Sequence, residues 1–417
     1  MFSRNSVQTF SPTQCLVPLV VAAIAAVAGC ELDRSPTGTA PADSLSGDAF
    51  SADLAATAIG APLPFLTLDQ QGLFTRGSVV FQTVFTPATG LGPLFNSISC
   101  SECHEAPVAG GGGDELETAA TAFHGDGTCD DLAASGGPVI QDSVTPALHD
   151  ALGIYEEPVP LQATGTGRRT TPDLLGFGLL DAVPAWEILA RADPSDRNGD
   201  GISGRPNFSA DGRLGRFGRK AQEPTLREFN AGAFLFEMGI TNPAKPKEET
   251  IGGNPLPAGV DPAPDAELNQ QDFDAANGFV QLLAPPRRQP LSIGALKGYY
   301  EFAKIGCAAC HVPALFTGYN PVGALSYKRV YAYTDLLLHD MGPALADICL
   351  GRATPSEFRT EPLMGLRFVQ EFLHDGRAAT IEEAISLHGG EAARSRDRYL
   401  RLSSPDRWAL LEFLNRL

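Results

Sequence analysis

Two short segments of the chain place a histidine directly after a pair of cysteines. One is Cys100-Ser-Glu-Cys103-His104 and the other is Cys307-Ala-Ala-Cys310-His311. The C-x-x-C-H pattern is typical of covalent haem attachment. Two thiols add to the two vinyl groups of a haem, and the adjacent imidazole binds its iron. The sequence therefore predicts two haem c groups, one on each segment.

Chance does not explain the pattern. The chain holds 8 Cys and 7 His in 417 positions, which gives roughly 0.003 expected matches to such a motif. Zinc is the main alternative, but zinc-binding pairs usually lie closer together and need no adjacent His. A thioredoxin-like redox pair would lie near a βαβ pattern, which neither segment has. Covalent haem attachment is the favoured interpretation.

Cys129 and Cys349 are left over after the haem segments and the N-terminal cysteines are accounted for. In an oxidising compartment they could form a disulfide that joins the two halves of the chain. They could equally be two buried free thiols, because spacing alone does not determine connectivity.

The N-terminus resembles a bacterial export signal. Arg4 is followed by an apolar run of 15 residues, Cys15–Gly29, which is short for a membrane span of about 20 residues. The run ends in small residues directly before Cys30, as in a lipoprotein cleavage site. We expect a signal peptide over 1–29, lipidation of Cys30 and a periplasmic, lipid-anchored protein. A plain secretory signal is the alternative.

Composition limits the class of protein and its partners. The apolar fraction is 43 %, and 49 acidic against 31 basic residues give a net charge of −18. Such a chain would repel a phosphate backbone, so we expect no nucleic-acid partner, and membrane contact only through the lipid anchor. Residues 30–65 have the polar, Pro- and Gly-rich composition of a flexible tether. We assign an N-terminal haem domain to 66–270 and a C-terminal haem domain to 271–417.

Helical patterns dominate the chain, and strand-like alternation is scarce. The sequence predicts a helix over Gln271–Leu283 that ends before Pro285, and one over Ala295–Ile305 that leads into the second haem segment. Ser404 can cap a last helix from Pro405. Its expected apolar side holds Trp408, Leu411, Phe413 and Leu414. The expected fold is mainly α, with two c-type cytochrome domains and long loops.

A short element recurs after each haem segment. Arg169-Thr-Thr-Pro172 follows its haem histidine by 65 residues, and Arg359-Thr-Glu-Pro362 follows by 48. Because both elements occur in the same order after a C-x-x-C-H segment, they suggest that the two cytochrome domains arose by duplication.

Several further segments together resemble the di-haem oxidoreductase/peroxidase family, often labelled thiol oxidoreductase and related to bacterial di-haem cytochrome c peroxidases. The resemblance spans nearly all of the chain after about residue 70. The matching segments are Gly92–Asn96, Arg169–Pro172, Asp196–Asn207, Glu237–Thr241, His339–Gly342, His374–Arg377 and Glu383–Glu391.

The resemblance implies ligands for the second haem. In these peroxidases a segment like His374–Ala384 precedes the distal ligand, which is usually Met, and His388 takes that position here. We therefore expect His388 to be the sixth iron ligand opposite His311, which would lower the potential of this haem. Met341 is the second candidate and Met364 the third. Otherwise His388 would only bond to backbone near a Gly-Gly turn.

At the first haem, the sixth position is less clear from the sequence. His124 lies 20 residues after His104, a separation at which this family can place a removable ligand, and Met238 is another candidate. An open iron at His104 is at least as compatible with the sequence, and peroxide chemistry requires one. His104 is thus the expected catalytic ligand.

A calcium-type loop is predicted before the middle of the chain. Its ligand oxygens alternate in sequence, but Asn207 stands where the closing Glu of such a loop would be. Related di-haem peroxidases hold calcium between their haem domains, and a solvated turn is the alternative. Trp186, just before the loop, is expected in the core. The candidate calcium ligands are Asp196, Asn198, Asp200 and Ile202.

The function expected from these features is a periplasmic di-haem oxidoreductase, peroxidase-like in its chemistry. A small redox donor protein would deliver electrons to the C-terminal haem, and peroxide or another oxidant would react at the N-terminal haem. Glu237 is a candidate for the acid/base group that this chemistry needs. The alternatives are an electron-transfer cytochrome without catalytic activity and a haem-based sensing or accessory protein.

Overall fold

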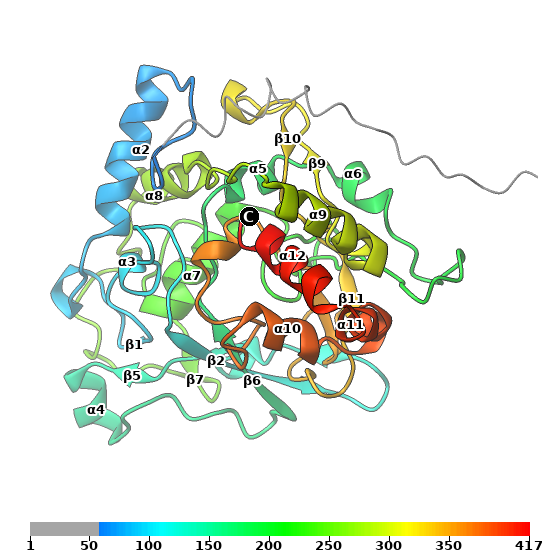
Figure 1. Ribbon diagram of the computed structural model, residues 1–417. Helices are drawn as coiled ribbons and strands as arrows, with labels where there is room; N and C mark the ends of the chain where they lie inside the picture. The colour runs from blue at the N-terminus through cyan, green and yellow to red at the C-terminus, as the bar shows by residue number, and fades with distance from the viewer. Residues whose placement is uncertain (1–57) are drawn as a thin grey trace, which may run out of the picture. The chain divides into compact units, whose positions relative to one another are not determined.

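Helices and short strands alternate along residues 58–417, the part of the chain that the computed structural model describes (Figure 1). Helix accounts for 33 % and strand for 14 %, so the expected predominance of helix is confirmed. None of the helices in this part is both long and apolar enough to cross a membrane. The predicted signal peptide, Cys30 and most of the predicted tether lie outside the described residues.

Eleven α-helices of this part carry the labels of Figure 1, and a serine, threonine or asparagine side chain caps most of the longer ones. The helices are α2 (Leu68–Phe81), α3 (Cys100–Cys103), α4 (Pro146–Leu152), α5 (Phe177–Asp181), α6 (Ala185–Leu189), α7 (Leu226–Met238), α8 (Gln270–Leu282), α9 (Ile293–Ile305), α10 (Ile381–Leu387), α11 (Ala393–Leu400) and α12 (Ser404–Leu414).

The strands are short and antiparallel. In the largest sheet β3, β4 and β6 all pair with β2, and β4 and β6 lie on opposite edges of it because both pair with Thr118 and Ala119. Two-stranded pairs account for the remaining strands in the described residues. The strands are β1 (Leu94–Phe95), β2 (Leu116–Phe123), β3 (Cys129–Asp130), β4 (Val139–Ile140), β5 (Ser143–Val144), β6 (Gly165–Thr170), β7 (Thr250–Ile251), β8 (Asn254–Pro255), β9 (Leu315–Phe316), β10 (Arg329–Val330), β11 (Leu338–Asp340) and β12 (Glu357–Arg359).

The three predicted helices exist, with two differences in the last one. Helices α8 and α9 agree with the predicted ranges to within one or two residues at each end. Helix α12 is capped by Ser403 and not by Ser404. Trp408 is 63 % exposed, so it does not belong to the buried side, which Leu410 occupies instead. The strands β2 and β6 pair over six residues, although the sequence showed little strand-like alternation.

Each half of the chain contains a pair of helices that cross at a glycine. Helix α2 packs on α8, and a Cβ atom at Gly77 would lie 1.9 Å from the carbonyl oxygen of Ala275. Helix α9 packs on α12, and a Cβ atom at Gly298 would lie 1.9 Å from the carbonyl oxygen of Ala409. Only glycine permits such close approach. Cys100 of the first haem segment packs against the first pair, and Cys307 of the second segment packs against the second pair.

The packing of α8 corrects the predicted domain boundary at 270/271. This helix packs against α2, α5 and α7, all of which precede it in the sequence. It therefore belongs to the core of the N-terminal half. Residues 58–417 lie in one compact unit, and the same core contains Leu325 and Val330, so the structure shows no boundary between two domains in this range. The predicted tether also ends earlier than residue 65, because Leu63 is buried and its N–H donates to the carbonyl of Leu282.

A disulfide joins Cys129 of β3 to Cys349, 220 positions later. The structure thus favours the disulfide over the two free thiols that the sequence left open. Cys349 is fully buried, and its backbone N–H donates to Thr121 of β2. The bridge ties the sheet of the N-terminal half to the C-terminal half.

Removing this disulfide is expected to destabilise the protein. A Cys129→Ser/Cys349→Ser variant should lose about 2–4 kcal/mol of unfolding free energy, since the bridge restricts the unfolded chain over a long loop. Urea unfolding followed by circular dichroism measures the loss. Wild type treated with a thiol reductant is the matched control and should approach the variant. Identical midpoints for all three samples would contradict the expectation.

Candidate functional site

The first haem segment starts as a single helical turn whose end presents His104. The hydroxyl of Ser99 caps α3 by accepting a hydrogen bond from the N–H of Glu102, at 3.1 Å. The Nδ1 atom of His104 lies 2.9 Å from the carbonyl oxygen of Gly111. A Cβ atom at Gly111 would lie 2.0 Å from the carbonyl oxygen of Ala106, so only glycine brings this carbonyl into place. The Gly-rich loop therefore orients the imidazole.

Burial keeps the groups of this segment uncharged. It lowers the pKa of His104 to about 4, and it raises the pKa of Cys100 to about 12, with the charge of Cys103 as a second cause. His104 is neutral at pH 7, which is the form that binds a metal. Its Nδ1 is engaged with Gly111, so Nε2 is the nitrogen left for a metal.

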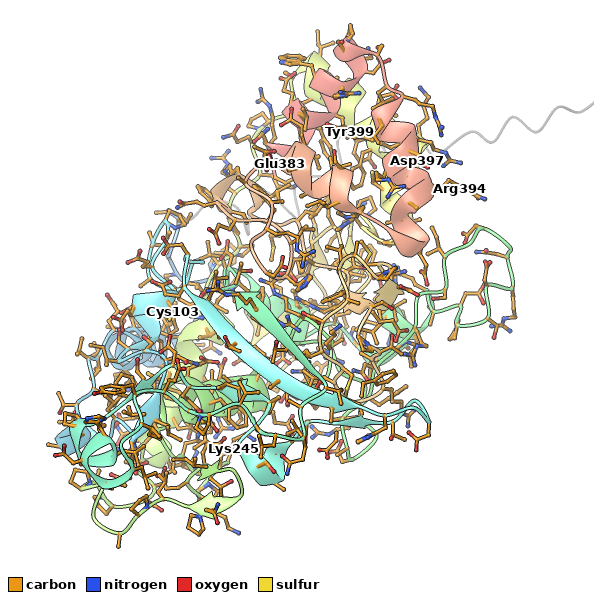
Figure 2. All side chains as sticks on the ribbon, turned by 90° about the horizontal axis from the view of Figure 1, so that it is seen from below. Cys103, Lys245, Glu383, Arg394, Asp397 and Tyr399 are labelled. Carbon is orange, nitrogen blue, oxygen red and sulfur yellow. A yellow bond between two sulfur atoms is a disulfide. The ribbon has the colours of Figure 1, made fainter. Side chains whose placement is uncertain are left out.

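A cavity of about 630 Å³ opens beside this segment. Cys100, Cys103 and His104 line it, and its volume lies in the range of small-molecule and cofactor sites. Figure 2 shows Cys103 beside the start of the long strand β2, which forms one wall. The apolar part of the lining includes Phe81, Leu174, Phe177, Phe229, Met238 and Val280.

A buried carboxyl group faces this cavity from the end of α7. Glu237 accepts a hydrogen bond from Nδ2 of Asn96 at 2.8 Å. Its pKa is raised well above the ordinary value, first by burial and then by the neighbouring carboxyl of Glu117 on β2, with which it shares a hydrogen bond. The raised pKa favours the protonated form of Glu237, and two carboxyls in hydrogen-bond contact favour sharing one proton. Glu237 can therefore donate a proton into the cavity.

Five cationic side chains line the same cavity: Arg169, Arg219, Lys220, Lys245 and Arg359. Arg169 pairs with the buried carboxylate of Asp347, and Lys220 lies 3.4 Å from the same carboxylate. The two R-T-x-P elements meet here, because Arg219 donates to the carbonyl of Thr170 and its own carbonyl accepts from the N–H of Arg359. The sequence predicted the elements, but neither Asp347 nor Lys220.

The second haem segment lies in an aromatic environment. Nδ1 of His311 lies 3.0 Å from the carbonyl oxygen of Tyr333, and the rings of Phe302, Tyr333 and Phe413 pack edge to face around it. Burial, and then the neighbouring His388, lower the pKa of His311 to about 4. As at the first segment, a neutral imidazole keeps Nε2 for a metal.

His388 and Met341 both lie at this second segment. Nδ1 of His388 lies 2.7 Å from the carbonyl oxygen of Ala384, in the last turn of α10, which leaves its Nε2 for a metal. A Cβ atom at Gly389 would lie 2.6 Å from the carbonyl oxygen of Met341, so the two candidates are neighbours. Met364, the third candidate, packs instead against the core of the N-terminal half.

Other predicted residues lie away from both segments. His124 is exposed in the turn after β2 and does not line the cavity. Trp186 is 65 % exposed, so the expectation that it belongs to the core is wrong. It stands on the short helix α6, which buries Glu187 and Ile188 in its place. His339, in contrast, lies at the second segment: its Nδ1 is 3.6 Å from Sγ of Cys310, and its buried ring bonds to Asp335 at 2.9 Å and to Glu391 at 2.8 Å.

The predicted calcium loop forms a sharp exposed turn whose oxygens are used within the loop. The carboxylate of Asp196 accepts from the N–H of Gly201, Asn198 Oδ1 from the N–H of Asp200, and Asp200 Oδ1 from the N–H of Ile202. Asn207, at the place of the closing Glu, is buried and donates to the carbonyls of Lys220 and Leu350. Calcium binding by Asp196, Asn198, Asp200 and Ile202 stays a prediction.

The residues present fit a haem at both segments. At the first, two thiols and a neutral imidazole line one cavity, and Arg169 lines it with a buried Nη2 that has no hydrogen-bond partner among the described residues. A guanidinium suits the carboxylate of a haem propionate. At the second, the half-buried imidazoles of His311 and His388 lie close together, and Cys307 packs against an apolar cluster. The first segment adjoins a cavity that Glu237 also lines, and at the second segment His388 could bind the remaining position of a haem iron.

Comparison with known proteins agrees with this chemistry. Residues 155–417 match the profile of the family described as "Di-haem oxidoreductase, putative peroxidase". A cytochrome c551 peroxidase of Nitrosomonas europaea is 27 % identical over 103 residues, which cover 24 % of this chain and 29 % of that protein. The chain thus matches less than a third of the length of this curated relative.

Solved structures resemble the chain at low sequence identity. The di-haem peroxidase BthA of Burkholderia thailandensis has 18 % identity and a TM-score of 0.38, covering 86 % of this chain and 87 % of its own. A hydrazine synthase of Kuenenia stuttgartiensis has 14 % identity and a TM-score of 0.38, covering 96 % and 99 %. A MauG-like protein associated with microbial copper homeostasis has 16 % identity and a TM-score of 0.38, covering 85 % and 92 %.

Proposed function

The chain belongs to the di-haem oxidoreductase family, and on that basis we propose that it is a peroxidase that reduces peroxide in the cavity beside His104. The observation that carries this proposal is the difference between the two haem segments. The first adjoins a cavity with a buried acid, Glu237, whereas the second adjoins a second imidazole, His388. One site can admit a substrate, and the other can hold an electron.

Cys100, Cys103 and His104 would hold one haem c, and Cys307, Cys310 and His311 would hold the other. When bound, the haems supply electron storage and the cleavage of the O–O bond. The chain supplies position, protons and exclusion of water. In this proposal His388 closes the second site, with Met341 as the second candidate.

Protons are the contribution of the chain to the overall reaction, in which one hydrogen peroxide, two electrons and two protons give two water molecules. Glu237 holds a proton at its carboxyl, and the amide of Asn96 fixes the orientation of that carboxyl. The apolar wall of the cavity keeps water from the donor, which strengthens its interaction with a polar substrate.

Electrons would enter at the second segment from a small redox donor protein and pass to the first. Residues after the two R-T-x-P elements lie in contact: a Cβ atom at Gly365 would lie 2.8 Å from Oδ2 of Asp173, and one at Gly176 would lie 2.8 Å from Cε of Met364. Pro172 lines the cavity with His104, and Leu366 packs with Cys307. This contact supports a short path between the two sites.

The proposed location is the periplasm, with a lipid anchor at Cys30. The apolar run before Cys30 supports export. The disulfide between Cys129 and Cys349 supports an oxidising compartment, because disulfides are rare in the reducing cytosol.

The ligand role of His388 has a spectroscopic consequence. In His388→Met, the second haem should gain Met/His ligation and a higher potential, and in His388→Ala it should become high-spin. Visible spectra and a redox titration measure both changes. His124→Ala, at an exposed histidine, is the control and should leave the spectra unchanged. Identical spectra for all three variants and wild type would remove His388 from the ligands.

Peroxide addition to the purified ferric protein tests the function itself. We expect a high-spin signal from the first haem that disappears on adding peroxide, and continuous peroxide consumption when a reductant is present. If both haems were low-spin in every redox state and unreactive toward peroxide, the protein would be an electron-transfer cytochrome without catalytic activity.

A further inference from the structure

Charge is distributed very unevenly along the chain. Residues 1–286 hold 15 Lys and Arg against 35 Asp and Glu, whereas residues 287–417 hold 16 against 14. The acidic character therefore comes from the N-terminal half alone. A partner that approaches the C-terminal half meets a surface of different charge.

The arginines of the C-terminal half are concentrated on one helix. Arg394 and Arg398 of α11 and Arg401 at its C-terminal end follow each other at spacings of four and three residues, and all three are exposed. This spacing places them on one face of a helix. Figure 2 shows Arg394 at the outer edge of α11. We call these three residues the arginine stripe.

The stripe is not neutralised by the protein. None of its three side chains forms an ion pair with a carboxylate among the described residues; Arg394 donates to the carbonyl of Asp200 at 3.2 Å and Arg398 to that of Ile305 at 3.3 Å. The carboxylate on α11 itself, Asp397, is paired with Arg396 at 2.8 Å. Unpaired exposed guanidinium groups keep their charge available to a partner.

The stripe lies directly beside the second haem segment. The carbonyl that Arg398 contacts belongs to Ile305, two residues before Cys307, and a Cβ atom at Gly306 would lie 3.3 Å from Nη1 of Arg398. On its buried side, α11 places Tyr399 in the same cluster as Cys307. The Nη1 atom of Arg396 donates to the carbonyl of His388. A protein bound on the stripe would be close to the second site.

We propose that the arginine stripe is the docking surface for a small acidic redox protein, which delivers electrons to the second site. This inference rests on the proposed function, because it uses the proposed route of electrons. In each encounter the donor loses one electron and this protein gains it, with no bond formed or broken. Guanidinium groups bind carboxylates in fixed fork geometry, so a donor with surface Asp and Glu suits the stripe.

Local charge decides such an encounter even though the whole chain is acidic. At an ionic strength of 0.1 M, charges separated by more than about 10 Å are largely screened. Arg394 contacts the backbone of Asp200, so part of the acidic half lies beside the stripe, whereas acidic residues farther away are largely screened from a docked donor. Charge pairing of this kind raises association rates by a factor of about 10 or more.

The test uses two forms of one electron donor. A lysine-rich cytochrome c of the mitochondrial type is the basic probe, and the same cytochrome after succinylation of its lysines is the acidic probe. Each is reduced and mixed with the full di-haem protein in 0.1 M salt without peroxide, and the second-order rate of its oxidation is measured. Calorimetric titration of the acidic probe gives the affinity independently of electron transfer.

The variants reverse equal charge at two places. Arg394→Glu/Arg398→Glu/Arg401→Glu removes the stripe, and Arg76→Glu/Arg168→Glu/Lys247→Glu reverses three exposed cations of the N-terminal half. With the acidic probe, the stripe variant should lose about tenfold or more in rate and the control less than about twofold. Arg394→Gln/Arg398→Gln/Arg401→Gln should show a smaller loss, and it serves if the reversal does not fold.

Each outcome is decisive. Equal losses in both variants, or faster reaction of wild type with the basic probe, would overturn the proposal. So would a stripe variant that loses binding to phosphatidylglycerol vesicles while its reaction with the acidic probe is unchanged, since the stripe would then bind a lipid surface. Normal docking with no peroxide turnover would instead contradict the proposed function and leave the docking surface standing.

Discussion

Replacing Glu237 with glutamine is expected to lower peroxide turnover by a factor of about 10² to 10⁴. Glutamine keeps the size of the side chain and can still bond to Asn96, but it cannot release a proton. The haem spectra and the haem content should remain those of wild type, because Glu237 contacts neither Cys103 nor His104 by a hydrogen bond in the structure. Stopped-flow peroxide consumption with a small-molecule reductant measures the effect.

The pH dependence of wild type follows from the direction of the pKa shift of Glu237. Burial and the contact with Glu117 raise its pKa, so its proton is retained to a higher pH than that of an ordinary carboxyl. Turnover should be retained below this raised pKa and be lost as the pH rises through it. In Glu237→Gln this alkaline loss should disappear, because the titrating group is gone.

Glu249→Gln is the matched control for this experiment. Burial raises the pKa of Glu249 to about 7, but Glu249 does not line the cavity. Its substitution should leave both the turnover and the pH profile unchanged. Full activity of Glu237→Gln would show that Glu237 is not the proton donor. Another acid of the cavity would then have to donate the proton, and Glu117→Gln would be the next variant.

Local features of this structure were predictable from the sequence. The two C-x-x-C-H segments and the helices α8, α9 and α12 depend on residues within a few positions of one another, whereas the expectation for His388 came from the resemblance to the family. Spacing and caps specify such elements without knowledge of the fold. The helical periodicity of the apolar residues nevertheless put Trp408 on the buried side of α12, which is wrong, because the packing of α9 determines which side is buried.

Features that depend on distant parts of the chain were not predictable. Strand β2 pairs with β6, which lies 44 to 54 residues later in the chain. Residues 119–122 of β2 are all buried, so both faces of this strand are covered and its sequence shows no alternation. In the sequence, Asn207 stands where a calcium loop would have its closing Glu. In the structure its side-chain amide donates hydrogen bonds to the carbonyls of Lys220 and Leu350. Such roles arise only when separate segments meet, and no spacing in one sequence reports them.

Asp347 is the residue at which most of these distant segments meet, and Asp347→Asn is expected to cost about 3–5 kcal/mol of unfolding free energy. Its side chain is 7 % exposed and pairs with Arg169, with Lys220 at 3.4 Å and with His374 at 3.2 Å. Without this carboxylate, Arg169 would lose its ion-pair partner, and the fully buried Lys220 would have only Glu357 nearby, which is paired with Arg205. An uncompensated buried charge is among the most destabilising changes in a protein.

The same residue should control stability in acid. Hydrogen bonds and charges from His374, Arg169 and Lys220 overcome the effect of burial and lower the pKa of Asp347 below its usual range. The contribution of a carboxyl with a lowered pKa is present above its unfolded value, about 3.9, and is lost as the pH falls toward the folded value. The difference between wild type and Asp347→Asn should therefore be full at pH 6 and shrink below pH 4. Urea unfolding at several pH values measures it.

Above pH 7, Lys220 reduces the unfolding free energy that Asp347→Asn loses. Burial lowers its pKa to about 7, so above that pH it can give up its proton, and only Arg169 stays charged beside the missing anion. We therefore expect Asp347→Asn to be more destabilising at pH 6 than at pH 9. The matched control is Asp211→Asn, at an exposed pair with Arg213, which should leave unfolding unchanged. If Asp347→Asn matched that control at pH 6, the two R-T-x-P elements would have to be held together by the disulfide and the apolar contacts alone.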